Sequence, residues 1–243
     1  MPKKIFTEIQ SKKLKKLGIL NSLDLLLHIP LRYIDETKID LIKDIRPGSM
    51  CQIEAKIISI EVSYRPRKNL TVYVQDVSGE LKLRFINLYP SQIKQFEEGM
   101  ILRVYGEIKS NSFLFEMVHP QYEIIFIDTP LKNFYTPVYP LTEGLSQKLI
   151  FKLIQKVFEQ ENLNEKYPDY FGNLYRKKNL PSLLESLKLI HKPSKEYEKK
   201  LFDEKKSIFH QRVIYDELLT HQFYFRGKYH ENKSYKSKPI QYL

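Results

Sequence analysis

The chain has 243 residues, of which 42% are hydrophobic, so wholesale disorder is excluded and one large domain or two small ones are expected. Lys and Arg outnumber Asp and Glu by 40 to 29, and the net charge of +11 favours an anionic partner: DNA, RNA or an anionic membrane surface. The single cysteine, Cys51, excludes an internal disulfide, and the absence of a long apolar run or a signal sequence predicts a cytoplasmic protein.

Two short helices are predicted within residues 5–30. The turn Leu17–Ile19 around Gly18 separates them, Asn21 or Ser22 caps the second, and Pro30 ends it. Two interpretations stay open. The pair is either a helical hairpin packed on a barrel or a helix-hairpin-helix whose glycine turn offers backbone N–H groups to a phosphate. Residues 31–47 are expected to be a connecting segment.

Residues 48–126 contain five strand-like runs. We expect them at 50–62, 70–75, 81–86, 100–109 and 112–118, with the last resuming at 122–127 and a short helix at 91–98 before the fourth. The alternation breaks at Ile57-Ile58, which predicts a bulge that bends the first strand. Five strands with a helix between the third and fourth are typical of an OB-fold, whose outer face and loops bind oligonucleotides.

The second and third runs form a hairpin around Asp76-Val77-Ser78-Gly79, where Asp and Ser can bond nearby backbone and Gly tolerates positive φ. In the third run, alternation turns Leu81, Leu83 and Phe85 inward. The outward side carries Lys82, Arg84 and Ile86, with Asn87 and Tyr89 just beyond, a mixture that suits a polyanion with flat bases. The loop before the hairpin adds Arg65, Arg67 and Lys68 as candidate phosphate contacts.

The C-terminal half is predicted to be helical. Segments 146–160, 182–190 and 196–229 are the candidates, punctuated by prolines. The fold class is therefore expected to be α+β. The expected domains are an N-terminal helical hairpin region (1–47), a five-stranded OB-fold barrel (48–127) and a helical region (128–243).

A series of short motifs resembles the N-terminal, branched-DNA-binding part of the bacterial ATP-dependent DNA helicase RecG. In chain order they are residues 17–19, 24–33, 76–79, 83–87, 104–107, 116–122, Pro137–Leu145, 180–181, His191–Pro193 and 216–219. The resemblance implies a wedge domain, built on an OB-fold, that binds replication forks and Holliday junctions in DNA recombination and repair. It also implies that aromatic rings occupy the positions of Phe85 and Ile86, where this chain has only one ring.

The family's two motor lobes are expected to be absent from this chain. The phosphate-binding pattern G-x-x-x-x-G-K-[ST] does not occur, because Gly227-Lys228 is followed by Tyr229 and lacks the upstream glycine. Asp216-Glu217 is expected on an amphipathic helix and not in an ATPase strand. We therefore expect no enzymatic activity and no cofactor, since ATP and Mg²⁺ would belong to the motor lobes. The chain is then a fragment or a truncated reading frame, and a separately encoded helicase motor is a candidate partner.

Branched DNA is the expected partner, at the bacterial nucleoid, and no membrane is expected. Two alternatives come from other classes: an OB-fold RNA-binding protein, and a non-enzymatic scaffold whose helical half docks a protein. Metal binding is not expected, because the six histidines are scattered without an H-x-x-x-H pair and His119 is expected to be structural.

Overall fold

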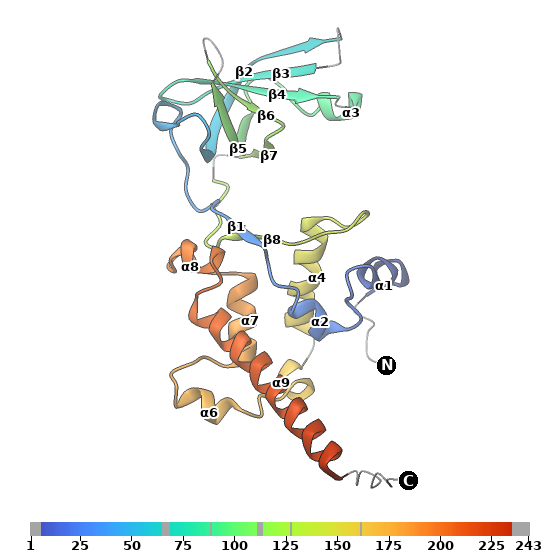
Figure 1. Ribbon diagram of the computed structural model, residues 1–243. Helices are drawn as coiled ribbons and strands as arrows, with labels where there is room; N and C mark the ends of the chain where they lie inside the picture. The colour runs from blue at the N-terminus through green and yellow to red at the C-terminus, as the bar shows by residue number, and fades with distance from the viewer. Residues whose placement is uncertain are drawn as a thin grey trace, which may run out of the picture. The chain divides into compact units, whose positions relative to one another are not determined.

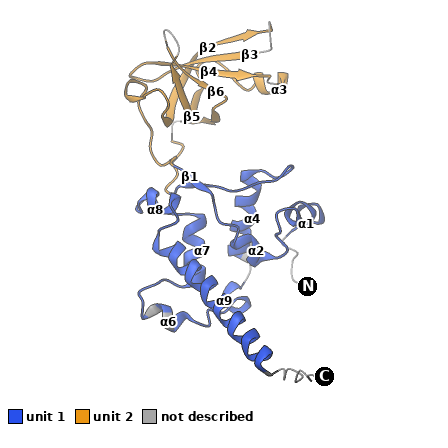
Figure 2. Cartoon of the chain, in the orientation of Figure 1, with its two compact units in different colours: residues 1–34, 134–243 blue, residues 35–133 orange. Residues whose placement is uncertain are grey.

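The computed structural model describes residues 6–64, 69–87, 89–110, 114–126, 128–160 and 162–234. The chain forms two units, one of residues 1–34 and 134–243 and the other of residues 35–133 (Figure 2). Residues 35–47 belong to the unit that contains the barrel, because Ile42 and Ile45 are buried in its core. The first unit is therefore built from two segments that are distant in sequence.

Residues 35–133 contain a closed five-stranded barrel (Figure 1). Its strands are β2 (Met50–Ser63), β3 (Asn69–Gln75), β4 (Glu80–Ile86), β5 (Ile101–Ser110) and β6 (Phe115–Val118), with β7 (Gln121–Ile125) after them. They pair in the order β2-β3-β4-β6-β5, with β4 and β6 parallel, and β5 closes the barrel by pairing with β2. The predicted α+β class with an OB-fold barrel is confirmed.

The last run of the barrel is interrupted, as its sequence predicts. β6 and β7 both pair with β5, and between them His119 adopts a left-handed conformation with φ 50° before Pro120. The bulge in β2 is also confirmed, since the pairing with β3 shifts register between Ile57 and Ser59. The helix predicted at 91–98 is shorter than expected, because α3 covers only Pro90–Ile93. Phe113, expected in the last run, lies outside the described residues.

The turn between β3 and β4 is held by Asp76. Its Oδ1 accepts hydrogen bonds from the N–H groups of Ser78 and Gly79, and its Oδ2 accepts one from Ile42 N–H at 2.9 Å. Burial raises the pKa of this carboxyl, but the hydrogen bonds outweigh it and the pKa is lowered overall. Gly79 does not adopt a positive φ, the freedom that glycine brings to a turn; a Cβ there would lie 3.1 Å from Ile42 Cγ2, so the glycine is needed for close approach.

Residues 1–34 and 134–243 form a helical unit. Its elements are α1 (Glu8–Lys15), α2 (Ser22–Leu26), α4 (Gln147–Gln160), α5 (Leu163–Lys166), α6 (Gly172–Arg176), α7 (Leu183–His191), α8 (Lys199–Asp203) and α9 (Ile208–Ser234), with a small sheet of β1 (Arg32–Ile34) and β8 (Thr136–Val138). The helical segment predicted at 196–229 is two helices, α8 and α9. Lys205, with φ 56°, lies between them, and Ser207 Oγ accepts a hydrogen bond from His210 N–H in the first turn of α9.

The N-terminal helical pair is confirmed, and Asn21 caps α2 by accepting a hydrogen bond from Asp24 N–H. Its expected packing on the barrel is wrong, because Leu14, Leu25 and Leu26 share a core with α4 inside the helical unit. The turn does not offer free donors to a phosphate. The N–H groups of residues 17–19 donate to carbonyls of α1, and those of residues 20 and 21 donate to Asp24 Oδ2.

Across the described residues, no helix combines the length and the apolar character that crossing a membrane requires.

Candidate nucleic-acid interface

The two faces of β4 separate as its alternation predicts. Leu81 and Leu83 are fully buried and Phe85 is 2% exposed, whereas the residues between them are partly exposed. The Phe85 ring contacts those of Phe96 and Tyr122, with centroids 5.4 and 5.5 Å away. Phe85 is therefore a core residue that nucleic acid cannot reach without unfolding the barrel, and Ile86 faces outward.

The outward face is less basic than β4 alone indicates. The strand order places Glu116 of β6 beside Lys82 and Arg84, and Arg84 Nη2 lies 3.0 Å from Glu116 Oε1. On the other side, Tyr73 is opposite Lys82, and its hydroxyl donates to Glu61 Oε2 at 3.4 Å. Arg84 is thus held by a carboxylate, while Lys82 has no such partner among the described residues. Sequence reasoning missed both glutamates because they come from other strands.

An apolar and aromatic edge lies where β4 ends. Asn69, at the start of β3, pairs with Ile86 and also with Ser63, at the end of β2, so all three strand ends meet at this edge. Tyr89, just after β4, is 73% exposed, and Tyr64, just after β2, is 71% exposed. We call Tyr64, Ile86, Asn87 and Tyr89 the barrel edge.

The backbone of the barrel edge is fixed by hydrogen bonds. His119 N–H donates to Arg84 O at 2.8 Å, and His119 Nε2 accepts from Ile86 N–H at 3.3 Å, so the predicted structural role of His119 is confirmed. Asn87 is left-handed, with φ 60°, and turns the chain towards α3. Tyr89 N–H donates to Gln92 Oε1, which anchors the backbone of the exposed ring. Tyr64 was missed by sequence reasoning, although its place beside the basic loop is a usable signal.

Three candidate residues, Arg65, Arg67 and Lys68, lie outside the described residues, and so does Leu88. The connection that contains the three basic residues starts and ends at the barrel edge, because β2 ends at Ser63 and β3 begins at Asn69. Their phosphate contacts stay a prediction.

Comparison with known proteins identifies the family. The family described as "RecG wedge domain" matches residues 3–160, well over half of the chain. The chain belongs to the RecG wedge domain family. The ATP-dependent DNA helicase RecG of Haemophilus influenzae is 32% identical over 96% of this chain and 34% of its own length, and that of Escherichia coli K12 is 31% identical over 87% and 30%.

A solved structure agrees with this assignment. The chain resembles "RecG bound to three-way DNA junction" with a TM-score of 0.67 and 26% identity, over 95% of this chain and 31% of that one. The chain therefore spans about a third of the length of the RecG proteins it matches.

Several RecG-like motifs meet at one structural site in the helical unit. Tyr139 Oη lies 3.0 Å from His191 Nδ1, and His191 Nε2 lies 2.7 Å from the carbonyl oxygen of Leu26, the last residue of α2. Burial lowers the pKa of His191 to about 4, so the imidazole is neutral near pH 7. The RecG motifs at 24–33, 137–145 and 191–193 therefore include residues that hold α2, β8 and α7 together.

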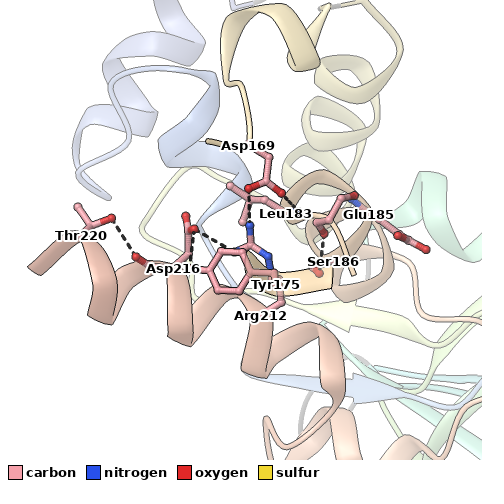
Figure 3. A network of polar contacts seen from close by, with 9 residues as sticks. Asp169, Tyr175, Leu183, Glu185, Ser186, Arg212, Asp216 and Thr220 are labelled. Atoms are coloured by element: carbon pink, nitrogen blue, oxygen red, sulfur yellow. Dashed lines mark hydrogen bonds and ion pairs between the residues drawn. The ribbon is translucent and has the colours of Figure 1, made fainter. Parts of the chain in front are cut away.

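A second polar cluster explains Asp216, which belongs to α9 as predicted and not to an ATPase strand (Figure 3). The Arg212 side chain is 0% exposed and contacts two carboxylates, with Nη2 2.8 Å from Asp169 Oδ1 and Nη1 2.9 Å from Asp216 Oδ1. Its guanidinium carbon lies 3.6 Å from the centre of the Tyr175 ring. Asp169 Oδ2 also accepts from Leu183 N–H, so the cluster ties α9 to the chain around α6 and α7.

In the part of the chain that the structure describes, no group of three or more His, Cys, Asp and Glu side chains could hold a metal ion. Cys51 is buried, and burial, with a smaller contribution from Asp40, raises the pKa of its thiol to about 11. The thiol is therefore protonated near neutral pH.

Proposed function

We propose that this chain binds branched DNA, replication forks and Holliday junctions, as the wedge region of a RecG-like helicase in recombination and repair. The observation that carries the proposal is the barrel edge, where exposed tyrosines flank an outward isoleucine in a family with a solved member described as bound to a three-way DNA junction. A place of action on chromosomal DNA in the nucleoid follows from it.

The barrel edge would recognise the branch point by shape. A tyrosine ring offers a flat face for the terminal base pair of an arm, and such stacking contributes roughly 1–3 kcal/mol per base. Ile86 has no such face but can press against an unstacked step as an apolar wedge. Lys82 is the described cation of β4 available to a phosphate, because Arg84 is bound by Glu116.

Replacing Tyr89 with Ala is expected to reduce the preference for a three-way junction over linear duplex of equal length by about 1–3 kcal/mol, because a stacking ring is lost. Fluorescence anisotropy with labelled DNA measures both affinities. Tyr170→Ala removes a tyrosine that is 84% exposed in the helical unit and is expected to leave the preference unchanged. Equal affinity of the unmodified chain for linear and branched DNA would refute the proposed function.

Ile86→Phe is expected to strengthen junction binding by about 1 kcal/mol, because it adds a π-face to an outward position. The same assay measures it, and a melting curve shows whether the barrel accepts the ring. A stable Ile86→Phe variant with weaker junction binding would mean that the edge acts as a steric wedge and not by stacking.

We also propose that the chain alone hydrolyses no ATP and that a separate motor polypeptide, which would bind ATP and Mg²⁺, joins it through α9. Leu218, Phe225 and Tyr229 recur at helical spacing on α9 and are each more than half exposed.

Junction-stimulated ATP hydrolysis by the separately purified motor region of the Haemophilus influenzae relative is expected to rise when this chain is added. Phe225→Asp should abolish the rise, whereas Thr220→Asp, at an exposed position on the opposite side of α9, should not. Hydrolysis by the chain alone would contradict the proposal.

A further inference from the structure

The positive charge of the chain does not lie in the barrel. Residues 35–133 contain 13 Lys and Arg against 14 Asp and Glu, whereas the rest of the chain, which forms the helical unit, contains 27 against 15. The barrel unit is thus close to neutral and the helical unit carries an excess of twelve positive charges. Since attraction to a polyanion scales with the cations near it, the main electrostatic surface is to be sought among the helices.

The outer side of α1 carries part of this charge. Leu14 is 1% exposed and turns towards the core, which leaves Lys12, Lys15 and Lys16 exposed on the remaining sides of the helix. Within the described residues, none of these three lysines forms an ion pair or a hydrogen bond through its side chain. Lys12 and Lys16 are four residues apart, so their charges are neighbours on one side of the helix.

The outer side of α4 repeats the pattern. Ile150 and Ile154 are fully buried, while Lys148 and Lys152, again four residues apart, are exposed and have no carboxylate partner in the described part of the chain. The two helices are neighbours, because Leu14 shares a core with Ile150 and Lys13 Nζ donates to the carbonyl oxygen of Gly144, just before α4. Both helices thus bury their apolar sides together and present lysines to solvent.

Paired lysines at this spacing repel each other and make each helix slightly less stable than a Lys–Glu pair would. Some lysines elsewhere in the chain do have carboxylate partners: Lys200 and Lys206 lie 3.8 and 2.7 Å from Glu204 carboxylate oxygens. We propose that Lys12, Lys16, Lys148 and Lys152 form a phosphate-binding surface for the backbone of a duplex arm. This proposal rests on the proposed function, because that function identifies the polyanion as DNA. It goes beyond the proposed function by placing the non-specific affinity for DNA outside the barrel.

Duplex DNA fits this surface better than a lipid bilayer does. A helix that lies on a membrane inserts its apolar side between the lipids. The apolar sides of α1 and α4 are already buried against each other, and the sides that face solvent carry lysines. A phosphate backbone attracts these lysines and needs no apolar side chain to insert into it.

The test compares two variants of the full chain with the same change in net charge. The first replaces Lys12, Lys16, Lys148 and Lys152 with Gln. The control replaces four lysines that lie within 3.8 Å of a carboxylate oxygen: Lys38, Lys200, Lys206 and Lys228. Affinities for linear duplex and for a three-way junction are measured between about 50 and about 200 mM salt.

The first variant is expected to bind both DNAs at least tenfold more weakly and to flatten the salt slope by about 3 to 4, since each phosphate contact contributes roughly 0.9. The control is expected to change affinity less than threefold. Equal losses in both variants, or loss of binding to phosphatidylserine vesicles with DNA binding intact, would overturn the proposal. The salt slope measured on linear duplex tests the lysine surface independently of any junction preference. If the unmodified chain shows no junction preference, that result refutes the proposed function and leaves the test of the lysine surface intact.

Discussion

Phe85→Ala is expected to lower the free energy of unfolding of the barrel by about 3–5 kcal/mol. The Phe85 ring is 2% exposed and sits among the rings of Phe96, Tyr122 and His119. Its removal leaves a cavity that these neighbours, anchored in different strands and loops, fill only in part. Urea denaturation followed by circular dichroism measures the loss.

Ile86→Ala is the matched control on the same strand. Ile86 is only partly buried on the outward face, so its truncation is expected to cost less than about 1.5 kcal/mol. If Ile86→Ala unfolds early while Phe85→Ala is stable but loses junction binding, the two faces of β4 are reversed in function.

The double variant Asp169→Ala, Asp216→Ala is expected to destabilise the helical unit by about 3 kcal/mol, because it leaves the charge of Arg212 buried without a partner. The Arg212 side chain is 0% exposed, whereas those of Asp169 and Asp216 are 24% and 29% exposed, so water already screens part of the pairing. This places the effect at the lower end of what breaking a buried ion pair costs.

Glu217→Ala is the control for the Arg212 cluster. Glu217 lies next to Asp216 on α9, its side chain is 72% exposed and its Oε1 lies 3.9 Å from His221 Nε2. Its loss is expected to change stability by less than about 0.5 kcal/mol. An equal melting temperature for the double variant and for Glu217→Ala would mean that the cluster does not hold the helices together.

The strands and most helices could be predicted because their signals are local. The alternation of β4, the break at Ile57-Ile58 and the Asn21 cap each depend on a few neighbouring residues, and the structure shows all three. The split between α8 and α9 also has a local signal, the cap at Ser207, but the continuous helical pattern around it hid the boundary.

The candidate interface could be predicted only in part, because its electrostatics depend on pairing between distant strands. Glu116 is 32 residues from Arg84, and only the parallel pairing of β4 and β6 brings the two together. The same holds for the helical unit, where Leu26 and His191 meet across 165 residues. The lysines could be located in the sequence, but only the fold shows that residues 1–34 and 134–243 form one unit and that this unit carries the excess positive charge.

The most direct test of the central claim is amide hydrogen exchange of the full chain, compared with a three-way junction and with linear duplex of equal length. Slower exchange at residues 82–93, the end of β4 and α3, is expected with the junction but not with the duplex, because the barrel edge contacts only a branch point. Equal protection of these residues by both DNAs, or protection by neither while the junction is bound, would contradict the account.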